Sequence, residues 1–488
     1  MLLSLVVLYL IGTIMLGLWV ARRVKTTADY AIAGRHLPLY MIITTTFATW
    51  FGAEIVMGVP ARFVEGNLGS VVEDPYGAGM CLILVGVFIA RKLYPMSLLT
   101  ISDYYAERYG KVVEILCSLM IILSYLGWVA AQITALGLVF NLLTAGGLSI
   151  QMGMVIGTAS VLIYTIFGGM WSVAVTDFVQ MIVLVIGLLI ISAVAGNMVP
   201  GGPAQVIEYA NSKNMFQFFP EEPTVGAWLA FIGAAITLMF GSMPQQDVFQ
   251  RVMSANSMKA ATQGPVIGGL LYMSFAFVPM FLVASALIIM PEETRRLLAE
   301  DPQKILPTLV MHHMPFAMQV IFFGALLSAI KSCTSATLLA PTVTFVENIW
   351  RQFFPYVDDK TELRTMRVGL VCFSIFVLAY AIFAQGLPIY EMVSGAYQVT
   401  LVGAFIPLVM GIYWQKATTQ GAIASIVAGI GVWLIFMKMP GWDAAFPQQL
   451  AGLVAAFIAM IAGSLAPQWI AHRQSPHHYI TEDAPTAG

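Results

Sequence analysis

Long apolar segments separated by short polar ones run through the whole chain. A hydrocarbon core of about 30 Å is crossed by roughly 20 helical residues, and on that scale the pattern predicts 13 membrane-spanning helices. We expect them at about 2–20, 39–61, 76–92, 112–140, 150–168, 175–198, 225–243, 263–290, 312–349, 367–385, 389–413, 420–438 and 448–468. The predicted fold class is therefore an all-α polytopic membrane protein.

The composition agrees with a chain embedded in a lipid bilayer. It is 59% hydrophobic and 10% charged, with a mean hydropathy of +0.84, whereas a soluble domain carries roughly 25% charge. The net charge of −2 gives no support for nucleic-acid binding. The four cysteines lie in apolar segments without CxxC spacing, so we expect buried thiols rather than disulfides or a metal site.

The distribution of Lys and Arg predicts how the helices are oriented. With the N-terminus outside, the inner segments hold 16 of these residues and the outer segments hold 6. Short inner loops are enriched in Lys and Arg, so we expect an outer N-terminus and a cytoplasmic C-terminus. No N-x-S/T glycosylation acceptor occurs, which fits a bacterial inner membrane. The longest outer connections, about 199–224 and 291–311, have a composition that suits short surface helices.

A polar cluster lies in the middle of the ninth predicted span. Among residues 328–335, five are polar or charged: Ser328, Lys331, Ser332, Thr334 and Ser335. A charge at the bilayer centre costs about 2.5–3.5 kcal/mol on insertion scales, so such a cluster favours a cavity or a partner over lipid. The alternative is that small and hydroxyl residues only allow close packing of helices.

The second span carries signs of a broken helix. Gly52, Gly58 and Pro60 surround an acid, Glu54. Such breaks free backbone carbonyls that coordinate cations in transporters. A glycine-rich packing face with Glu54 bonded to a neighbour is the alternative. Further on, Asp177 follows a Gly pair, where it would open a helix as a cap because the positive end of the helix dipole favours a carboxylate.

Four motifs, in order along the chain, resemble those of the sodium/solute symporters. The segment GGMWSVAVTDFVQ at 168–180 is similar to that family's signature, and QQDVFQRVMSANS at 245–257 to its inner QR segment. SAIKSCTSATLLAPT at 328–342 resembles its ion-binding helix, and PLVMGIYW at 407–414 a late family stretch. The resemblance spans almost the whole chain.

The resemblance implies a leucine-transporter-like fold with two inverted five-helix repeats and three additional helices. The implied divisions are 1–38 (extra helix and inner loop), 39–198 (first repeat), 199–224 (outer connection), 225–413 (second repeat), 414–472 (two extra helices) and 473–488 (disordered inner tail).

The resemblance also implies binding residues. For the coupling ion they are the carbonyls of Ala48, Phe51 and Ala329 and the side chains of Ser332 and Cys333. A second ion or release position would use Asp177 and Ser335. The implied substrate cavity is lined by Glu54, Ile55, Asp74, Gln245, Gln246, Glu391, Ser394 and Gln398. Because a helix has 3.6 residues per turn, Ala329, Ser332 and Cys333 share one face.

Two residues depart from the family pattern. Cys333 stands where a hydroxyl is usual, and a thiol is a poor ligand for a hard cation. Lys331 stands where the family has an apolar residue, and its ammonium would repel a bound cation. We hypothesise that Lys331 pairs with an acid such as Glu54 in place of sodium, so that transport does not strictly require sodium and uses protons or exchange. The alternative is that Lys331 extends into an inner vestibule and leaves a weakened sodium site intact.

The sequence thus predicts a secondary active transporter, an ion-coupled symporter for a small polar organic solute. Sodium is the expected coupling ion unless Lys331 replaces it, and neither an organic cofactor nor an obligate protein partner is inferred. A sodium-independent exchanger and a non-transporting sensor on the same scaffold are the alternatives. An enzyme is not predicted, because no nucleophile–base set or metal-ligand spacing occurs.

Overall fold

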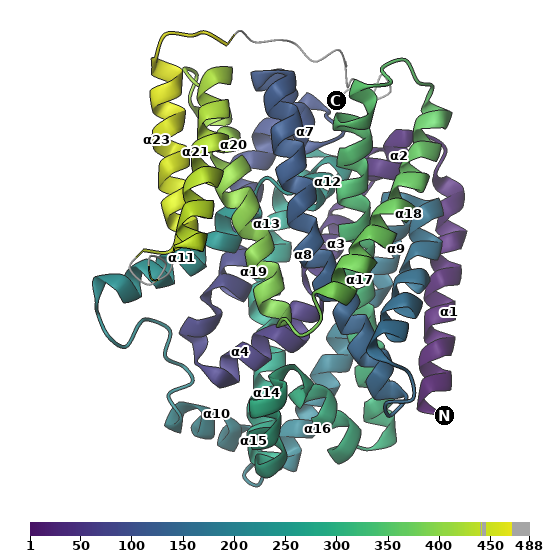
Figure 1. The fold of residues 1–488 in the computed structure, drawn as a ribbon. Coiled ribbons are helices and arrows are strands. Elements are labelled where there is room, and N and C mark those ends of the chain that lie inside the picture. Colours follow the sequence, from purple (N-terminus) through teal and green to yellow (C-terminus); the bar gives the residue numbers. More distant parts are fainter. Residues whose placement is uncertain (440, 442–445, 471–488) are drawn as a thin grey trace.

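A computed structural model shows a bundle of long, nearly antiparallel helices (Figure 1). It describes residues 1–439, 441 and 446–470, so the predicted tail at 473–488 lies outside the described residues. The long helices and the pieces of the broken ones are α1 (Leu2–Val20), α3 (Leu39–Trp50), η3 (Glu54–Gly58), α4 (Val59–Glu65), η5 (Val72–Gly77), α5 (Ala78–Leu84), η6 (Val85–Ile89), α6 (Ala90–Leu93), α8 (Lys111–Leu143), α9 (Ile150–Met198), α11 (Val225–Gly241), α13 (Met258–Phe275), α14 (Phe277–Ile289), α17 (Phe316–Asn348), α18 (Asp359–Phe383), α19 (Ile389–Thr400), η10 (Leu401–Phe405), α20 (Ile406–Tyr413), α21 (Thr419–Lys438) and α23 (Gln448–Leu465).

Short helices cap the two ends of the bundle. They are α2 (Thr27–Ile32), α7 (Ile101–Tyr109) and α12 (Gln246–Ser254) toward one end, and α10 (Gly202–Ser212), α15 (Pro291–Glu300), η8 (Pro302–Lys304) and α16 (Ile305–His313) at the other. We name these the α7 end and the α15 end, upper and lower in Figure 1. The helices α10 and α15 confirm the short surface helices predicted at 199–224 and 291–311, whereas α16 is buried over 305–310.

The membrane-spanning segments agree with the predicted all-α polytopic class. Ten described helices are long and apolar enough to cross a membrane, or up to twelve if each of two bent pairs forms one span. The 49-residue α9 counts once, although at 1.5 Å per residue it would be about 73 Å long if straight. Gly169, with φ 46° and ψ −140°, interrupts it between the predicted spans 150–168 and 175–198. The predicted number of 13 membrane-spanning helices stays a prediction.

Two sharp bends shape the centre of the bundle. The pair Leu39–Trp50 and Glu54–Glu65 is bent by 56°, and the pair Val225–Gly241 and Gln246–Ser254 by 46°. The first break falls at 51–53, immediately before Glu54, while Pro60 lies in the first turn of α4, a position that proline tolerates. The two predicted repeats each begin at one of these bent pairs, and the repeats remain a prediction.

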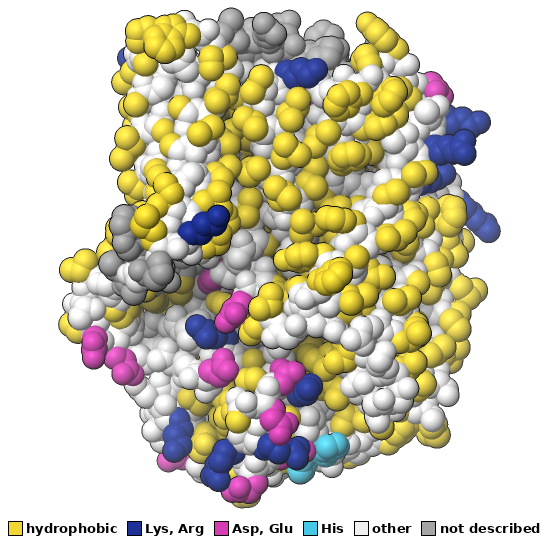
Figure 2. Space-filling model, in the orientation of Figure 1, with side chains coloured by type: hydrophobic (Ala, Val, Ile, Leu, Met, Phe, Trp, Pro, Cys, Tyr) yellow, Lys and Arg dark blue, Asp and Glu magenta, His cyan; other side chains and the backbone are white. Residues whose placement is uncertain are grey.

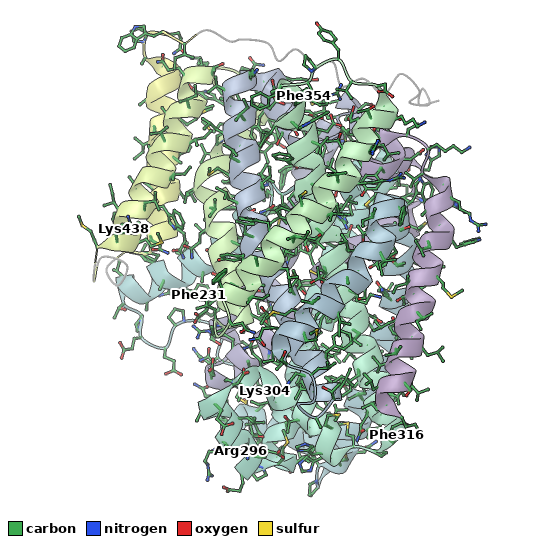
Figure 3. The ribbon with its side chains drawn as sticks, turned by 45° about the vertical axis from the view of Figure 1, so that its right-hand side comes forward. Phe231, Arg296, Lys304, Phe316, Phe354 and Lys438 are labelled. Atoms are coloured by element: carbon green, nitrogen blue, oxygen red, sulfur yellow. The ribbon has the colours of Figure 1, made fainter. Side chains whose placement is uncertain are left out.

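The outer surface separates apolar and charged side chains. A broad hydrophobic belt covers the visible flank, and charged side chains gather at the α15 end (Figure 2). Arg296 and Lys304 lie at that end and Phe354 at the other (Figure 3). One cysteine prediction is wrong: Cys81, Cys117 and Cys333 are buried, but Cys372 is exposed on the flank of α18.

Candidate ion and substrate site

The break after α3 leaves backbone carbonyls without their helical partners. The N–H of Gly52 donates to the carbonyl of Trp50 at 2.9 Å, and the N–H of Ala53 donates to Oε1 of Gln132 at 2.9 Å. In a regular helix these two donors would bond to the carbonyls of Ala48 and Thr49. Those carbonyl oxygens are therefore available as ligands, which is the feature that cation sites in broken membrane helices use.

Helix α17 faces this break with the residues predicted for the coupling ion. Ala329, Ser332 and Cys333 are all buried, and Cys333 packs directly on Gly52. A Cβ added at Gly52 would lie 2.8 Å from Cβ of Cys333 and 2.7 Å from Oε1 of Gln132, so only glycine allows this close approach. The structure thus places α17 and the break side by side.

Asp177 is not the helix cap that its position after the Gly pair indicates. It lies inside α9 and joins two other helices: the hydroxyls of Thr45 on α3 and Ser332 on α17 each donate to its carboxylate at 2.5 Å. Ser335, predicted beside it, instead donates to the carbonyl of Ser332 at 2.9 Å. The donor positions around Asp177 are therefore supplied by Thr45 and Ser332.

Three carboxylates gather where two helices are interrupted. Glu54 begins η3, while Glu73 and Asp74 lie in η5, and all three are buried. Glu54 lies within electrostatic range of both others. Ser394 donates to Glu73 at 2.9 Å and Tyr272 donates to Asp74 at 2.6 Å. The second carboxylate oxygen of Glu73 has no partner among the described residues. Ile55, predicted to line the same cavity, is fully buried next to Glu54.

An aromatic group borders these acids. Trp128 lies 5.3 Å from Tyr397 and 5.7 Å from Trp50, measured between ring centroids, and Trp50 lies 6.5 Å from Tyr272. All four rings are buried, and Tyr397 is within electrostatic range of Glu54. Aromatic faces next to carboxylates attract organic cations, because the ring quadrupole and the negative charge act in the same direction.

Farther toward the α7 end, the second bend contributes another acid, Asp247. Its carboxylate accepts the hydroxyl of Tyr125 at 2.5 Å and the indole N–H of Trp50 at 3.1 Å. At the same bend, the amide of Gln245 donates to the hydroxyl of Ser124 at 2.8 Å, and its own oxygen is buried without a partner among the described residues. This bend therefore faces the same interior as the broken α3.

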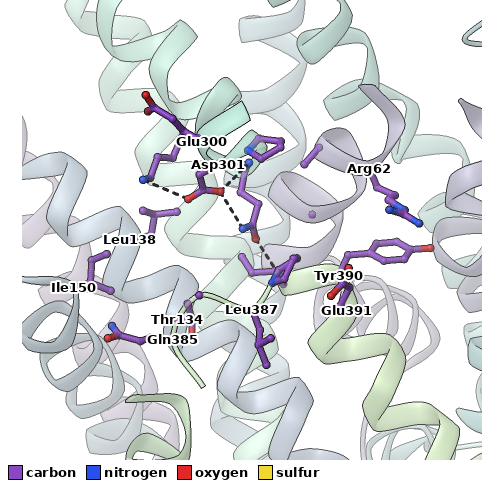
Figure 4. Close-up of a pocket in the computed structure, with 18 of the residues that line it drawn as sticks. Arg62, Thr134, Leu138, Ile150, Glu300, Asp301, Gln385, Leu387, Tyr390 and Glu391 are labelled. Carbon is purple, nitrogen blue, oxygen red and sulfur yellow. Dashed lines mark hydrogen bonds and ion pairs between the residues drawn. The ribbon is translucent and has the colours of Figure 1, made fainter. Parts of the chain in front are cut away.

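A cavity of about 780 Å³, which we name the vestibule, lies at the α15 end and is lined by residues of α4, η8 and α19. Figure 4 shows Arg62, Asp301, Tyr390 and Glu391 around it. Glu391 lines this vestibule with an exposed side chain, and its contact with substrate stays a prediction. Tyr390 is buried and interacts electrostatically with all three carboxylates, which places it between the vestibule and the acids.

A chain of polar contacts crosses the vestibule, drawn as dashed lines in Figure 4. Lys304 pairs with Asp301 at 3.4 Å. Asp301 accepts the side-chain amide of Gln303 at 3.1 Å, and the oxygen of Gln303 accepts the N–H of Ile389 at 3.0 Å. These contacts attach η8 and the end of α15 to the first residue of α19, the helix that carries Tyr390 and Ser394.

Two glutamines predicted for the substrate cavity are engaged elsewhere. Gln246 accepts the N–H of Ile101 at 2.8 Å and fastens α12 to α7. Gln398 accepts the indole N–H of Trp433 and the amide of Gln448, on α21 and α23. Their role in the substrate cavity stays a prediction, because sequence spacing along one helix does not reveal which neighbouring helix covers a given face.

Lys331 does not reach Glu54. Its ammonium donates to the hydroxyl of Thr13 on α1 at 2.8 Å and lies 5.4 Å from the ring centroid of Tyr164. None of the salt bridges among the described residues involves Lys331. Tyr9 of α1 also bonds to Ser328, one turn earlier on α17. The proposed ion pair is therefore wrong, and this face of α17 attaches the additional helix α1.

Several residues of the site were not predicted from the sequence: Thr45, Glu73, Trp50, Trp128, Gln132, Asp247, Tyr272 and Tyr397. Glu73 carried a usable signal, since two adjacent acids at the start of an apolar span are costly in lipid. Gln132 and Asp247 gave a weaker signal in the sequence, because an isolated polar residue in an apolar span also fits helix–helix packing.

Comparison with known proteins identifies the class. The model of the sodium:solute symporter family matches residues 30–429. A high-affinity choline transporter of Caenorhabditis elegans is 24% identical over 88% of this chain and 77% of its own length. A sodium/glucose cotransporter of Vibrio parahaemolyticus is 22% identical over 94% of this chain and 89% of its own.

Solved structures show the same architecture. A Na⁺-coupled sialic acid symporter superposes with a TM-score of 0.82 at 20% identity, over 97% of this chain and 99% of that one. MhsT in complex with L-phenylalanine superposes with a TM-score of 0.58 at 13% identity, over 88% and 98%. The fold is leucine-transporter-like, and the chain, a secondary transporter rather than an enzyme, belongs to the sodium:solute symporter family.

Proposed function

We propose that this protein is a sodium-coupled symporter that takes up a small organic cation of the choline class. The observation that carries the proposal is the meeting of three buried carboxylates, Glu54, Glu73 and Asp74, with the rings of Trp50 and Tyr397. Buried carboxylates need protons or a cation to compensate them. Aromatic rings beside them suit a quaternary ammonium group. The choline transporters among the relatives support this substrate class.

The coupling ion would bind where α17 meets the break in α3. The available oxygens there are the carbonyl of Ala48, the hydroxyl of Ser332 and the carboxylate of Asp177. Oxygen ligands suit a hard cation, and the thiol of Cys333 would contribute little. Ala329 and Phe51 complete the set carried over from the family. Because Lys331 is directed at α1, its charge is not placed at this site.

The α15 end would face outward, as the distribution of Lys and Arg indicates. Single cysteines at Glu300 and Tyr356, in a background with Cys372→Ala, test this orientation. Both positions are solvent-exposed: Glu300 ends α15, and Tyr356 follows closely after Phe354, which lies at the other end of the bundle. An impermeant thiol reagent applied to intact cells should label Glu300→Cys directly and Tyr356→Cys only after permeabilisation. The reverse pattern would invert the topology.

Uptake in proteoliposomes tests the function. Radiolabelled choline should accumulate under an inward sodium gradient and not when N-methylglucamine replaces sodium at constant pH. Glucose and sialic acid, tested as competitors, should leave choline uptake unchanged. Uptake that persists without sodium would favour a proton-coupled carrier or an exchanger. Binding without accumulation would favour a sensor.

A further inference from the structure

Arg251 on α12 is a buried arginine with unused hydrogen-bond donors. Its side chain is 1% exposed, and Nη1 donates to the carbonyl of Asp247 at 2.9 Å, one turn earlier on the same helix. Nε and Nη2 have no hydrogen-bond partner among the described residues. A buried guanidinium normally has its donors filled, because leaving a buried charge incompletely paired is costly. These two groups therefore need a partner at some stage of the transport cycle.

Two carboxylates lie within electrostatic range of Arg251 without pairing with it. Asp177 is held by Thr45 and Ser332, and Asp247 by Tyr125 and Trp50. Arg251 acts electrostatically on both, yet none of the salt bridges in the described part of the chain joins it to either acid.

Cys333, on the ion-site face of α17, is within range of the same three charges. The guanidinium therefore adjoins the proposed ion site from the α7 side.

We infer that Arg251 is an internal counter-cation that alternates with the coupling ion at Asp177. The inference rests on the proposed sodium site. While sodium is bound, its charge compensates Asp177 and the guanidinium stays on α12. When sodium leaves toward the α7 end, Nε and Nη2 donate to the carboxylate of Asp177, which the ion has vacated. The fork of donors on arginine suits this exchange, because it matches a carboxylate bidentately.

The exchange gives the empty carrier a route back to its starting state. Without a replacement charge, the empty site would keep a buried carboxylate uncompensated, and the conformational change would be unfavourable. The same guanidinium competes with sodium, and so weakens sodium binding. Lys331 does not serve this purpose, since its ammonium is bound to Thr13 of α1.

Sodium binding to the purified protein tests the competition without any substrate. The thermal unfolding of wild type and Arg251→Gln is followed while NaCl replaces N-methylglucamine chloride at constant ionic strength. The half-saturating sodium concentration should fall about tenfold in Arg251→Gln, which corresponds to about 1.4 kcal/mol. Arg351→Gln is the matched control, because Arg351 is half-buried in an ion pair with Glu347, and this variant should keep the wild-type value. If Arg251→Gln does not fold, Arg251→Lys is measured instead, and its half-saturating sodium concentration should fall about threefold.

The transport cycle supplies a second readout. Exchange of external for internal radiolabelled choline uses only the loaded carrier, whereas net uptake requires the empty carrier to return. Arg251→Gln should retain exchange within about twofold of wild type and lose net uptake by at least about tenfold. Equal loss of both activities would overturn the inference. An unchanged half-saturating sodium concentration in a folded Arg251→Gln variant would overturn it as well. If sodium does not change the thermal unfolding of the wild type, the proposed coupling ion itself is wrong.

Discussion

Two groups of buried acids in this protein differ in how many donors they receive. At the α7 end, Asp103 accepts the backbone N–H groups of Leu99 and Thr100, the hydroxyl of Thr100 and the amide of Asn348, at 2.7–3.0 Å. In the centre, Glu73 and Asp74 each accept one side-chain donor, from Ser394 and Tyr272. Both groups are excluded from solvent, yet only the first is hydrogen-bonded as a structural acid would be.

The difference separates acids that hold the fold from acids that bind a ligand. The amide of Asn348 also donates to Glu114 at 2.9 Å, so the α7-end acids connect α7, α8 and α17. The central acids leave acceptor capacity facing one another and the aromatic group. Like charges at close range are unfavourable unless a cation lies between them. We therefore expect mutations in the first group to reduce stability and mutations in the second to reduce binding.

Asp103→Ala should give the largest effect on stability. It removes the acceptor for four buried donors, each of which costs about 1–3 kcal/mol when left unsatisfied, so a loss of about 4 kcal/mol is expected. Thermal unfolding in detergent measures it, and Asp103→Asn, which keeps the size and one acceptor, should lose less. If Asp103→Ala is as stable as the wild type, the proposed distinction between structural acids and ligand-binding acids is wrong.

Glu73→Gln and Glu54→Gln should weaken choline binding with little loss of stability. Removing one charge from a buried cation site costs about 1.5–3 kcal/mol, which corresponds to roughly a 10- to 100-fold higher half-saturating concentration. Ile186→Val is the control, because Ile186 is 54% exposed on the flank of the bundle. Uptake kinetics and unfolding midpoints are measured together. A fall in stability like that of Asp103→Ala, with unchanged affinity, would contradict the assignment.

The sequence predicted the fold better than the site. Apolar runs located the helices, and the glycines around Glu54 located the break of α3, because these signals act within one segment. The place of a polar side chain depends instead on which helix packs against it. Asp177 fits a helix cap by local rules, but Thr45 and Ser332, far away in the chain, determine its actual environment.

Lys331 illustrates the same limit. Its position beside Ser332 suggested a role at the ion site, since adjacent residues seemed to share one environment. Neighbours on a helix are about 100° apart, however, so Ser332 reaches Asp177 while Lys331 reaches Thr13 of α1. An additional helix outside the two predicted repeats supplied the partner, and a repeat pattern carries no information about it.

Lys331→Met should have a smaller effect than either acid substitution. Its ammonium contacts a hydroxyl and a ring, and an apolar side chain of similar length can fill the same space. The half-saturating sodium concentration should stay within about twofold of wild type, while Cys333→Thr should lower it about threefold because an oxygen replaces sulfur. Sodium-dependent uptake that appears only in the double variant would show that Lys331 supplies the coupling charge after all.

Glu293 extends the comparison to an acid near solvent, and we expect its substitution to change the stability of the protein least. Although burial by itself raises the pKa of Glu293, hydrogen bonds from His313 at 3.1 Å and His312 at 3.0 Å lower it below its ordinary value of 4.5. A lowered folded-state pKa stabilises the protein above the unfolded-state value, and this contribution disappears as the pH falls through the folded-state pKa.

Because the partners are partly exposed, the contribution should be below about 1 kcal/mol. Unfolding midpoints of wild type and Glu293→Gln should therefore differ slightly at pH 6 and converge below about pH 4. A difference that grows as the pH falls would contradict this sign.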